Sequence, residues 1–406
     1  MTTPDLAATK RQTLVFAASQ AILGSVAPIA ISMGALAGLY LLGPDKSLAT
    51  APVTGFNVGV ALGALPAAWA IKTLGQKHGF MVGALISTLG GACAALALFQ
   101  YSFVMFILAL ALMGLGGAFT QQFRFAAADN APPVFKAQAI SWVLGGGIVS
   151  AVLGPQAVIL TRDMFLPVQF AGAYAAIVLF GLAGFAILTL LRITPQTKTQ
   201  ISDAAAPGTG RPLMEIIKQR RFIVALICSV GSYSLMSFVM TGAPLAMVGC
   251  GFSANEATLG IQWHVLAMFG PSFFTGKLIA RFGKETIVAS GLVILMLCAL
   301  VALSGIHLWQ FWTSLILLGL GWNFGFIGAT SMVTDCYKPE EKGAVQGFHD
   351  FVLFSSVALS SLFSGKILYV WGWNMVNLMI FPVTVLCLVA LGWLIFTNGS
   401  RKPVSA

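Results

Sequence analysis

Charged side chains are scarce in this sequence: Asp, Glu, Lys and Arg make up 8% of its 406 residues, whereas 58% are hydrophobic. A water-soluble protein carries about 25% charged residues, because its surface must be solvated. The chain is therefore expected to lie in a membrane. About 20 apolar residues cross a bilayer as one helix, so about ten to twelve helices would use nearly the whole chain. A separate catalytic or nucleic-acid-binding domain is excluded, because no residues remain to form one.

Motifs that carry chemistry are also missing. The six cysteines are scattered along the chain: Cys93, Cys228, Cys250, Cys298, Cys336 and Cys387. None forms a C-x-x-C pair or lies at metal-ligand spacing from a histidine, so we interpret them as small apolar residues and expect no metal or cofactor. The G-x-x-x-x-G-K-[ST] loop of ATP-driven transport is absent. No nucleophile, base and acid set is visible, so an enzyme is not expected.

Hydropathy in a window of about 19 residues predicts twelve membrane-spanning helices. The first six lie near residues 13–41, 50–71, 79–99, 102–127, 138–160 and 168–191. The second six lie near residues 222–247, 256–279, 286–305, 309–334, 344–369 and 374–397. The longest polar stretch, 192–219, has the composition of a flexible linker. The sequence therefore predicts an all-α membrane protein with an N-terminal bundle (1–191), a linker (192–219) and a C-terminal bundle (220–406).

The basic residues predict the orientation of these helices. With the N-terminus inside, every Lys and Arg falls on the side of the two termini except Lys46, Arg124, Arg162 and Lys366. Basic loops stay in the cytoplasm, so both termini are expected there. The net charge of +10 is then an orientation signal and does not indicate a nucleic-acid partner. Short outer loops fit a bacterial inner membrane, where we expect the protein to lie in the lipid bilayer as a monomer.

An internal repeat relates the two bundles. The pattern Asp-x6-Lys follows span 4, beginning at Asp129, and recurs 206 residues later after span 10, beginning at Asp335. Gly75 after span 2 and Gly283 after span 8 are 208 residues apart. Nearly equal offsets in separate loops favour two pseudo-symmetric halves, which is a transporter pattern.

With these features the sequence resembles the major facilitator superfamily over essentially its whole length. The family's signature after span 2, G-x-x-x-D-R-x-G-R-K, is degraded here, with Lys72 in place of its Asp. The copy after span 8 is closer and keeps Gly276, Arg281 and Gly283, with Ala280 in place of the Asp. The resemblance implies the major facilitator fold, with two six-helix bundles that rock around a central site.

The two Asp-x6-Lys patterns resemble the acidic-x6-Arg element of the sugar-porter branch of that family. By this resemblance Asp129, Lys136, Asp335 and Lys342 form contacts at the cytoplasmic gate, near Arg281 and Gly283. The alternative is that they are solvated loop charges, since exposed ion pairs are worth only about 0–1 kcal/mol.

Span 5 contains the sequence GGGIVSAVLGPQ, which ends with Gly154, Pro155 and Gln156. It is similar to the Gly-rich, Gly-Pro motif of drug and metabolite antiporters. Small residues let helices approach closely, so we expect Gly154 and Pro155 at a seam between the two halves. This likeness favours efflux by antiport.

Ionisable residues inside a membrane usually face a cavity, and Arg124, His264, His349 and Asp350 are the candidates. Arg124 lies five residues before Asp129, about 8 Å inside the cytoplasmic boundary, and Asp350 lies about 12 Å inside. We hypothesise that an Arg124–Asp350 ion pair closes the cytoplasmic gate and that Asp350 carries a coupling proton, with His349 or His264 as the competing carrier. The alternative is a static structural pair.

Substrate contacts are expected near the middle of the membrane. By the rise of a helix, His264 and Asn323 lie about 20 Å and about 18 Å inside. Other amide and aromatic residues lie on predicted cavity helices: Gln20, Asn57, Gln121, Gln122, Tyr233, Gln262, Trp263 and Trp322. Such groups suit a neutral or amphipathic organic solute. Alternatively, His264 is an interhelical hydrogen-bond partner, and Arg124 binds an anionic substrate.

The sequence therefore predicts a proton-coupled secondary transporter for a small organic molecule. An uptake symporter for an organic anion or metabolite is one alternative. A non-transporting receptor or assembly factor with the same fold is another, because degraded signature motifs fit it. The polar residues retained on the cavity helices argue against this last alternative.

Overall fold

The computed structural model describes residues 6–132, 135–192 and 210–399, and every regular element in these ranges is helical. The first half contains α1 (Leu6–Leu23), α2 (Val26–Leu41), α3 (Ala51–Phe99), α4 (Phe103–Thr120), α5 (Phe123–Asp129), α6 (Lys136–Thr161) and α7 (Ala171–Thr189). The second half contains α9 (Leu213–Ile217), α10 (Arg220–Gly249), α11 (Ala254–Phe269), α12 (Ser272–Phe282), α13 (Lys284–Leu303), α14 (Leu308–Val333), the 3-10 turn η1 (Pro339–Glu341), α15 (Lys342–Leu378) and α16 (Ile380–Gly399). The predicted all-α fold is confirmed.

Nine helical stretches among the described residues are long and apolar enough to cross a membrane. Two of them each contain two spans: α3 breaks at Gly75, and the stretch Lys342–Thr397 breaks at Gly372. A further span is divided at Gly270 into α11 and α12, so that neither piece reaches the length of a span by itself. Together these elements account for the twelve spans that the hydropathy predicts.

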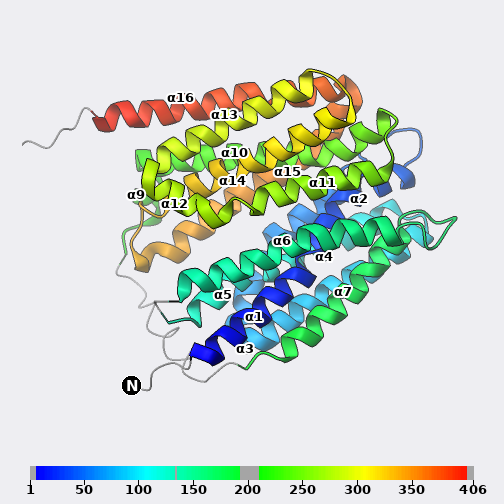
Figure 1. Ribbon diagram of the computed structural model, residues 1–406, viewed down its shortest axis with the longest axis horizontal. Coiled ribbons are helices and arrows are strands. Elements are labelled where there is room, and N and C mark those ends of the chain that lie inside the picture. The colour runs from blue at the N-terminus through cyan, green and yellow to red at the C-terminus, as the bar shows by residue number, and fades with distance from the viewer. Residues whose placement is uncertain (1–5, 133–134, 193–209, 400–406) are drawn as a thin grey trace, which may run out of the picture.

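The helices form two groups that follow the order of the chain (Figure 1). Helices α1 to α7 pack together, and α10 to α16 pack together. Each group has its own apolar core: one cluster surrounds Phe222, Met236 and Leu318, while two others surround Met33 and Phe16. The start of α1, the short helix α9 and the end of α16 lie at one end of the molecule, which we call the linker end; the opposite end is the far end.

The internal repeat is visible in the backbone. Gly75 has φ 82° and ψ 160°, and Gly283 has φ 86° and ψ 157°. Residues with a side chain rarely adopt a positive φ, so glycine is favoured at both turns. The two glycines that the sequence aligns therefore make the same turn between consecutive spans of each half.

Three expected spans are broken, which the hydropathy did not show. The first span begins at Leu6 and is interrupted at Ser25, because Pro28 leaves the carbonyl four residues before it without an amide donor. The eighth is interrupted at Gly270 and Pro271. The fourth is interrupted at Gln121 and Gln122 without a proline nearby, whereas α6 and α10 contain prolines and remain continuous.

Candidate functional site

The two halves meet through polar contacts towards the far end. Thr54 Oγ1 at the start of α3 lies 3.0 Å from Ser361 Oγ of α15, and Thr50 Oγ1 donates to the Leu362 carbonyl at 3.4 Å. Gln156 of α6 donates from Nε2 to Gln262 Oε1 of α11 at 2.8 Å. Each bond joins the first half to the second, so together they hold the far end closed.

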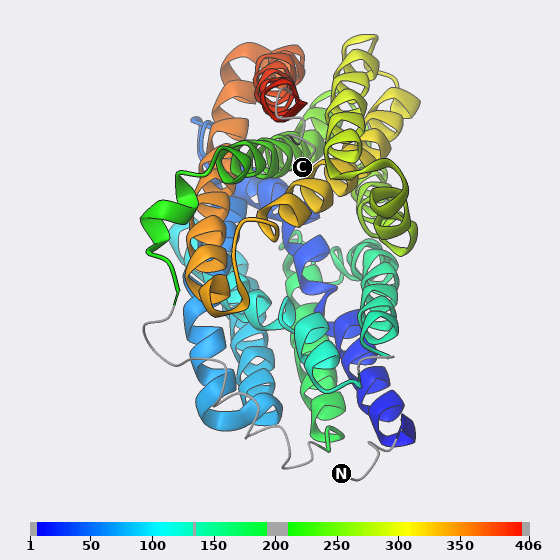
Figure 2. The ribbon, with the colours of Figure 1, turned by 90° about the vertical axis from the view of Figure 1, so that its left-hand side faces the viewer.

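At the linker end the two halves stand as separate groups (Figure 2). Arg124 is the second residue of α5, and Asp350 lies in the first third of α15; both side chains are exposed. Two helices thus present opposite charges from opposite halves.

Arg124 faces the second half. Its guanidinium lies 4.7 Å from the ring centre of the neighbouring Phe125, and its charge acts on Tyr233 of α10 and on Asp350 of α15. Arg124 and Asp350 therefore lie within electrostatic reach of each other across the boundary between the halves. They do not form an ion pair in this conformation, in which Asp350 is paired with His349 of its own half.

His349 links Asp350 to the core of the second half. Its Nδ1 lies 3.0 Å from Asp350 Oδ1, and its Nε2 lies 2.9 Å from Ser229 Oγ of α10. The imidazole is buried, while the Asp350 side chain is 52% exposed. A proton arriving at the exposed carboxylate can therefore be shared with a buried base through one hydrogen bond.

A group of aromatic rings lies beside Arg124 and Asp350. Tyr233 packs edge-on against Trp322 and Phe326 of α14, with ring centres 5.3 Å and 5.0 Å away, and against Phe354 of α15 at 6.0 Å. Trp322 and Phe326 are stacked at 5.2 Å with an interplanar angle of 17°. We call Tyr233, Trp322, Phe326 and Phe354 the aromatic cluster.

His264 and Asn323, expected at mid-depth in the cavity, lie inside the second half. His264 is fully buried, and its Nδ1 lies 2.8 Å from the Leu315 carbonyl of α14. Asn323 donates to the Met268 carbonyl and to Ser272 Oγ, and it accepts from Thr275 Oγ1. Both residues make interhelical hydrogen bonds, and those of Asn323 span the break between α11 and α12.

The other residues expected to contact substrate are dispersed. Gln262 makes the contact with Gln156 at the far end, and Trp263 beside it is 43% exposed. In the first half, Gln121 is exposed at the break before α5. The remaining three are partly buried there: Gln20, Asn57 and Gln122.

The expected gate-loop residues differ between the halves. Asp335 pairs with Arg221 at 2.9 Å and with Lys284 at 2.6 Å, and Arg221 also pairs with Glu285. Burial raises the pKa of Asp335, but the bonds from Lys284 and Arg221 outweigh it and hold the pKa below its usual value. All these partners belong to the second half.

In the first half, Asp129 and Lys136 are exposed in the corresponding loop, as is Lys342 in the second half. Arg281 lies over the ring of Phe282 at 5.1 Å, next to the turn at Gly283.

Gly154 makes its close approach within the first half. A Cβ on Gly154 would lie 2.8 Å from the Ser25 carbonyl oxygen and 3.2 Å from Pro28, at the break between α1 and α2. The seam with the second half is made by other glycines of α6: a Cβ on Gly147 would lie 3.8 Å from the Phe269 ring, and one on Gly145 would lie 3.9 Å from Phe273. Gly154 therefore contributes to packing around the break in the first span. Gly145 and Gly147 face the other half, whereas Gly146 between them packs on Ala17 of α1 in the first half.

One contact of the linker region was missed by the sequence reasoning. Glu341, a buried carboxylate in η1, accepts from the Arg211 backbone amide and from both Nε and Nη2 of its guanidinium, at 2.8–2.9 Å. Arg211 holds the pKa of Glu341 far below its usual value. No spacing pattern connects the two residues, which lie 130 positions apart. The contact fastens the end of the linker to the start of α15, the helix that carries His349 and Asp350.

Comparisons with known proteins agree with this architecture. The family model described as Major Facilitator Superfamily matches residues 12–328 and 264–406. A riboflavin transporter, RfnT of Brucella anthropi, is 48% identical over 387 residues, covering 95% of this chain and 96% of that protein. An uncharacterized MFS-type transporter of Bacillus subtilis, YdeG, is 29% identical over 369 residues, covering 88% of this chain and 86% of that protein.

Solved structures show the same fold. The nucleoside transporter NupG has a TM-score of 0.71 at 15% identity, covering 94% of this chain and 98% of its own. The xylose transporter XylE from E. coli has a TM-score of 0.70 at 12% identity, covering 93% of this chain and 97% of its own. At these identities the likeness concerns the path of the chain and carries no information on the solute.

Proposed function

The chain belongs to the major facilitator superfamily, and from this premise we propose that it carries riboflavin, or a solute with the same planar ring system, across the membrane. Transport of a small solute follows from the family and from its relatives. The observation that carries the choice of solute is the 48% identity to a riboflavin transporter along nearly the full length of both chains.

The aromatic cluster supports a flat solute. Aromatic rings gain about 0.5–1.5 kcal/mol per well-oriented pair beyond the burial of their area. Tyr233, Trp322 and Phe326 offer both edges and faces to a ring placed between the halves. The amide of Gln121, exposed beside Arg124, can hydrogen-bond the hydroxyl groups of a ribityl chain.

The separation of the halves supports alternating access. We infer that the linker end faces the cytoplasm, because most basic residues lie on the side of the two termini. The far end is then the outer face, which the Thr54–Ser361 and Gln156–Gln262 bonds close. The conformation is thus open to the cytoplasm, and transport requires these bonds to break while the linker ends come together.

Proton coupling is assigned to Asp350 and His349. When Asp350 is ionised, it attracts Arg124 of the opposite half and favours closure of the linker end. Protonation removes that attraction and leaves Arg124 without its counter-charge in the protein, so closure is disfavoured. His349 holds Asp350 in place and is the second proton acceptor of the pair.

A second candidate is an organic-anion carrier, and the position of Arg124 favours it. The guanidinium is exposed, and no carboxylate of the described residues forms an ion pair with it, so a carboxylate on a solute has access to it. Competition of riboflavin binding by simple carboxylates, lost in Arg124→Gln, would support this candidate. Competition by riboflavin analogues alone, unaffected by carboxylates, would support the flavin.

The test is flux of riboflavin into proteoliposomes with an imposed pH gradient. Antiport, which the Gly-rich segment of α6 favours, predicts uptake into vesicles that are acidic inside, and symport predicts uptake when the outside is acidic. Asp350→Asn should remove the dependence on the gradient while riboflavin binding persists. A protein that binds riboflavin but never moves it would be a receptor. An unaltered gradient dependence in Asp350→Asn would rule out the assigned role of Asp350.

A further inference from the structure

The indole N–H of Trp322 is buried without a hydrogen-bond partner. The side chain is 7% exposed, and the described part of the chain places no acceptor within reach of Nε1. Buried tryptophan N–H groups usually have a partner, because an unpaired donor has lost its bond to water. The orphaned donor lies in the aromatic cluster, where the solute is proposed to bind.

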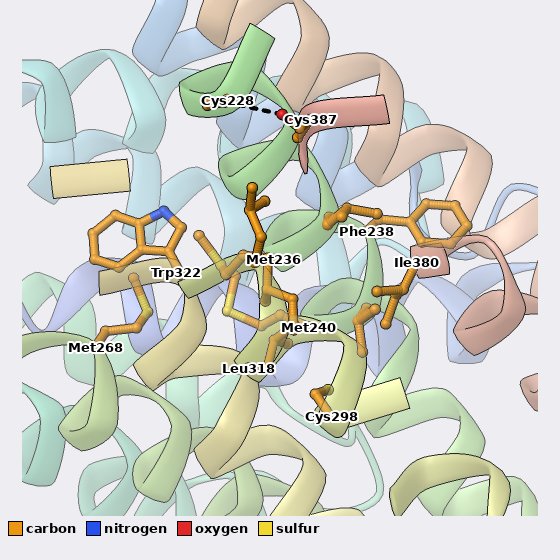
Figure 3. Packing of buried hydrophobic residues seen from close by; sticks show 14 of the residues in the cluster. Cys228, Met236, Phe238, Met240, Met268, Cys298, Leu318, Trp322, Ile380 and Cys387 are labelled. Carbon is orange, nitrogen blue, oxygen red and sulfur yellow. Dashed lines mark hydrogen bonds between the residues drawn. The ribbon is translucent and has the colours of Figure 1, made fainter. Parts of the chain in front are cut away.

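The surrounding rings fix the orientation of the indole. Phe326 is stacked on it, Tyr233 meets it edge-on, and Phe269 lies 6.5 Å away at 74°. The indole nitrogen points away from Met268 of the apolar core (Figure 3). Turning the N–H towards another protein acceptor would break these ring contacts, so the donor stays unpaired in the protein alone.

The position of Trp322 places this donor at the boundary of the halves. Phe269, its neighbour, is the ring that Gly147 of α6 approaches from the first half. Tyr233, its other neighbour, is within the electrostatic reach of Arg124. Contacts of both halves thus extend to the rings around the indole, as is required of a group that meets a solute held between them.

Two hydroxyl groups of α10 are likewise buried without a hydrogen-bond partner among the described residues. They are Ser232 Oγ and Ser234 Oγ, which flank Tyr233 in the chain. Ser232 Oγ lies 2.5 Å from the position that a Cβ on Gly325 would take, and Gly325 is three residues after Trp322 on α14. Among the described residues, Ser232 of α10 and Trp322 of α14 thus each leave a buried polar group unpaired where these two helices pack.

We propose that Trp322 is a specificity-determining residue, whose N–H donates a hydrogen bond to a carbonyl oxygen or ring nitrogen on the edge of a planar heteroaromatic solute. This inference rests on the proposed function, and it names the feature by which the solute is selected. The isoalloxazine ring of riboflavin carries such acceptors, whereas a carbocyclic ring of similar shape has none. A site whose buried donor is satisfied only by the correct solute rejects the analogue that lacks the acceptor.

The solute must move a side chain to reach this donor. Nε1 is covered in the present conformation, and two partly buried rings, those of Tyr233 and Phe269, pack edge-on against the indole. Displacement of one of these rings by the solute would replace one ring contact with another and give the solute access to the indole.

The experiment compares binding of riboflavin and of 9-anthracenemethanol, a three-ring carbocycle, to purified full-length protein by titration of ligand fluorescence. Trp322→Phe keeps an aromatic ring and removes the N–H. Trp371→Phe is the matched control, because Trp371 is a 60% exposed tryptophan of α15, 17 residues after Phe354. We expect Trp322→Phe to weaken riboflavin binding about tenfold, as for the loss of one buried hydrogen bond. Binding of the carbocycle should stay unchanged, and the control should bind both ligands as the unaltered protein does.

The outcomes separate the two proposals. If the unaltered protein binds riboflavin, and Trp322→Phe binds it equally well or loses affinity for both ligands in the same ratio, Trp322 has only a packing role and the inference is wrong. If the unaltered protein does not bind riboflavin, the proposed function fails and this inference fails with it. Trp322→Leu, which also has no hydrogen-bond donor, replaces Trp322→Phe in the comparison should the latter lose its cooperative thermal unfolding; riboflavin should then lose more affinity than the carbocycle.

Discussion

His349 and Ser229 are joined by a hydrogen bond that can run in either direction. Nε2 of His349 lies 2.9 Å from Ser229 Oγ, and the same hydroxyl lies 3.1 Å from the Leu226 carbonyl. The hydroxyl has one proton and therefore donates to one of them. If it donates to Nε2, the imidazole is neutral; if it donates to Leu226, it accepts from a protonated Nε2. His349 can thus gain a proton while every group keeps a partner.

Ser229→Ala should move the pH dependence of transport. The substitution leaves Nε2 of His349 without a partner whether the imidazole is neutral or protonated. The protonated imidazole loses more hydrogen-bond energy, because charge-assisted hydrogen bonds are about twice as strong as neutral ones. We expect the curve of initial riboflavin flux against pH to move to lower pH, because the protonated form loses the stronger hydrogen bond. Ser356→Ala is the control, since its hydroxyl bonds only within α15. A shift of equal size in the control would contradict the assignment.

Ser361→Ala should loosen the closed far end. It removes the bond to Thr54, which is worth about 0.5–1.5 kcal/mol and corresponds to a shift of about two- to tenfold towards the state open at the far end. Distances between spin labels on Leu48→Cys and Lys366→Cys, in a background without other cysteines, would report the two populations. Ser360→Ala is the neighbouring control, because its hydroxyl bonds to Ser356 in the same helix. Equal label distances in all three proteins would show that the bond does not hold the far end.

Glu341→Gln should lower the thermal stability of the protein by a few degrees and make it less sensitive to acid. The pKa of Glu341 is lower in the folded protein than in the unfolded chain, because Arg211 binds the carboxylate. Its contribution is therefore complete above the unfolded pKa of about 4.3 and is lost as the pH falls through the folded pKa. The difference in melting temperature between the unaltered protein and Glu341→Gln should begin to shrink below about pH 4 and continue to shrink as the pH falls towards the folded pKa. Glu340→Gln, at the exposed neighbouring position, should change little at any pH.

The spans and the repeat could be predicted because both depend on patterns along the chain. Long apolar runs are required by the bilayer, and Gly75 and Gly283 are required by the same turn. Helical rise also predicts similar depths for Arg124 and Asp350, which stays a prediction. It could not place His264, because depth along a helix does not tell which side of the helix a residue faces, and His264 faces Leu315 in its own half.

Other features depend on contacts that no local pattern records. The break at Gln121 has no proline to mark it, and the bond between Arg211 and Glu341 joins segments that are distant in the sequence. An Arg124–Asp350 ion pair depends on which conformation the transporter occupies, so one sequence is compatible with both its presence and its absence.

Asn323→Leu should be among the more destabilising substitutions in the second half, and Asn377 provides its control. Asn323 is fully buried and uses its amide for bonds to Met268, Ser272 and Thr275 across the break of the eighth span. Leucine has a similar size but leaves these groups unpaired, so we expect a loss of about 2–4 kcal/mol in the free energy of unfolding. Asn377 is equally buried but donates only to the Trp373 carbonyl in its own helix, and its Oδ1 has no partner. Asn377→Leu should therefore be neutral or stabilising. Denaturant unfolding of both variants in detergent would measure the difference, and equal losses would show that Asn323 does not stabilise the broken helix through these bonds.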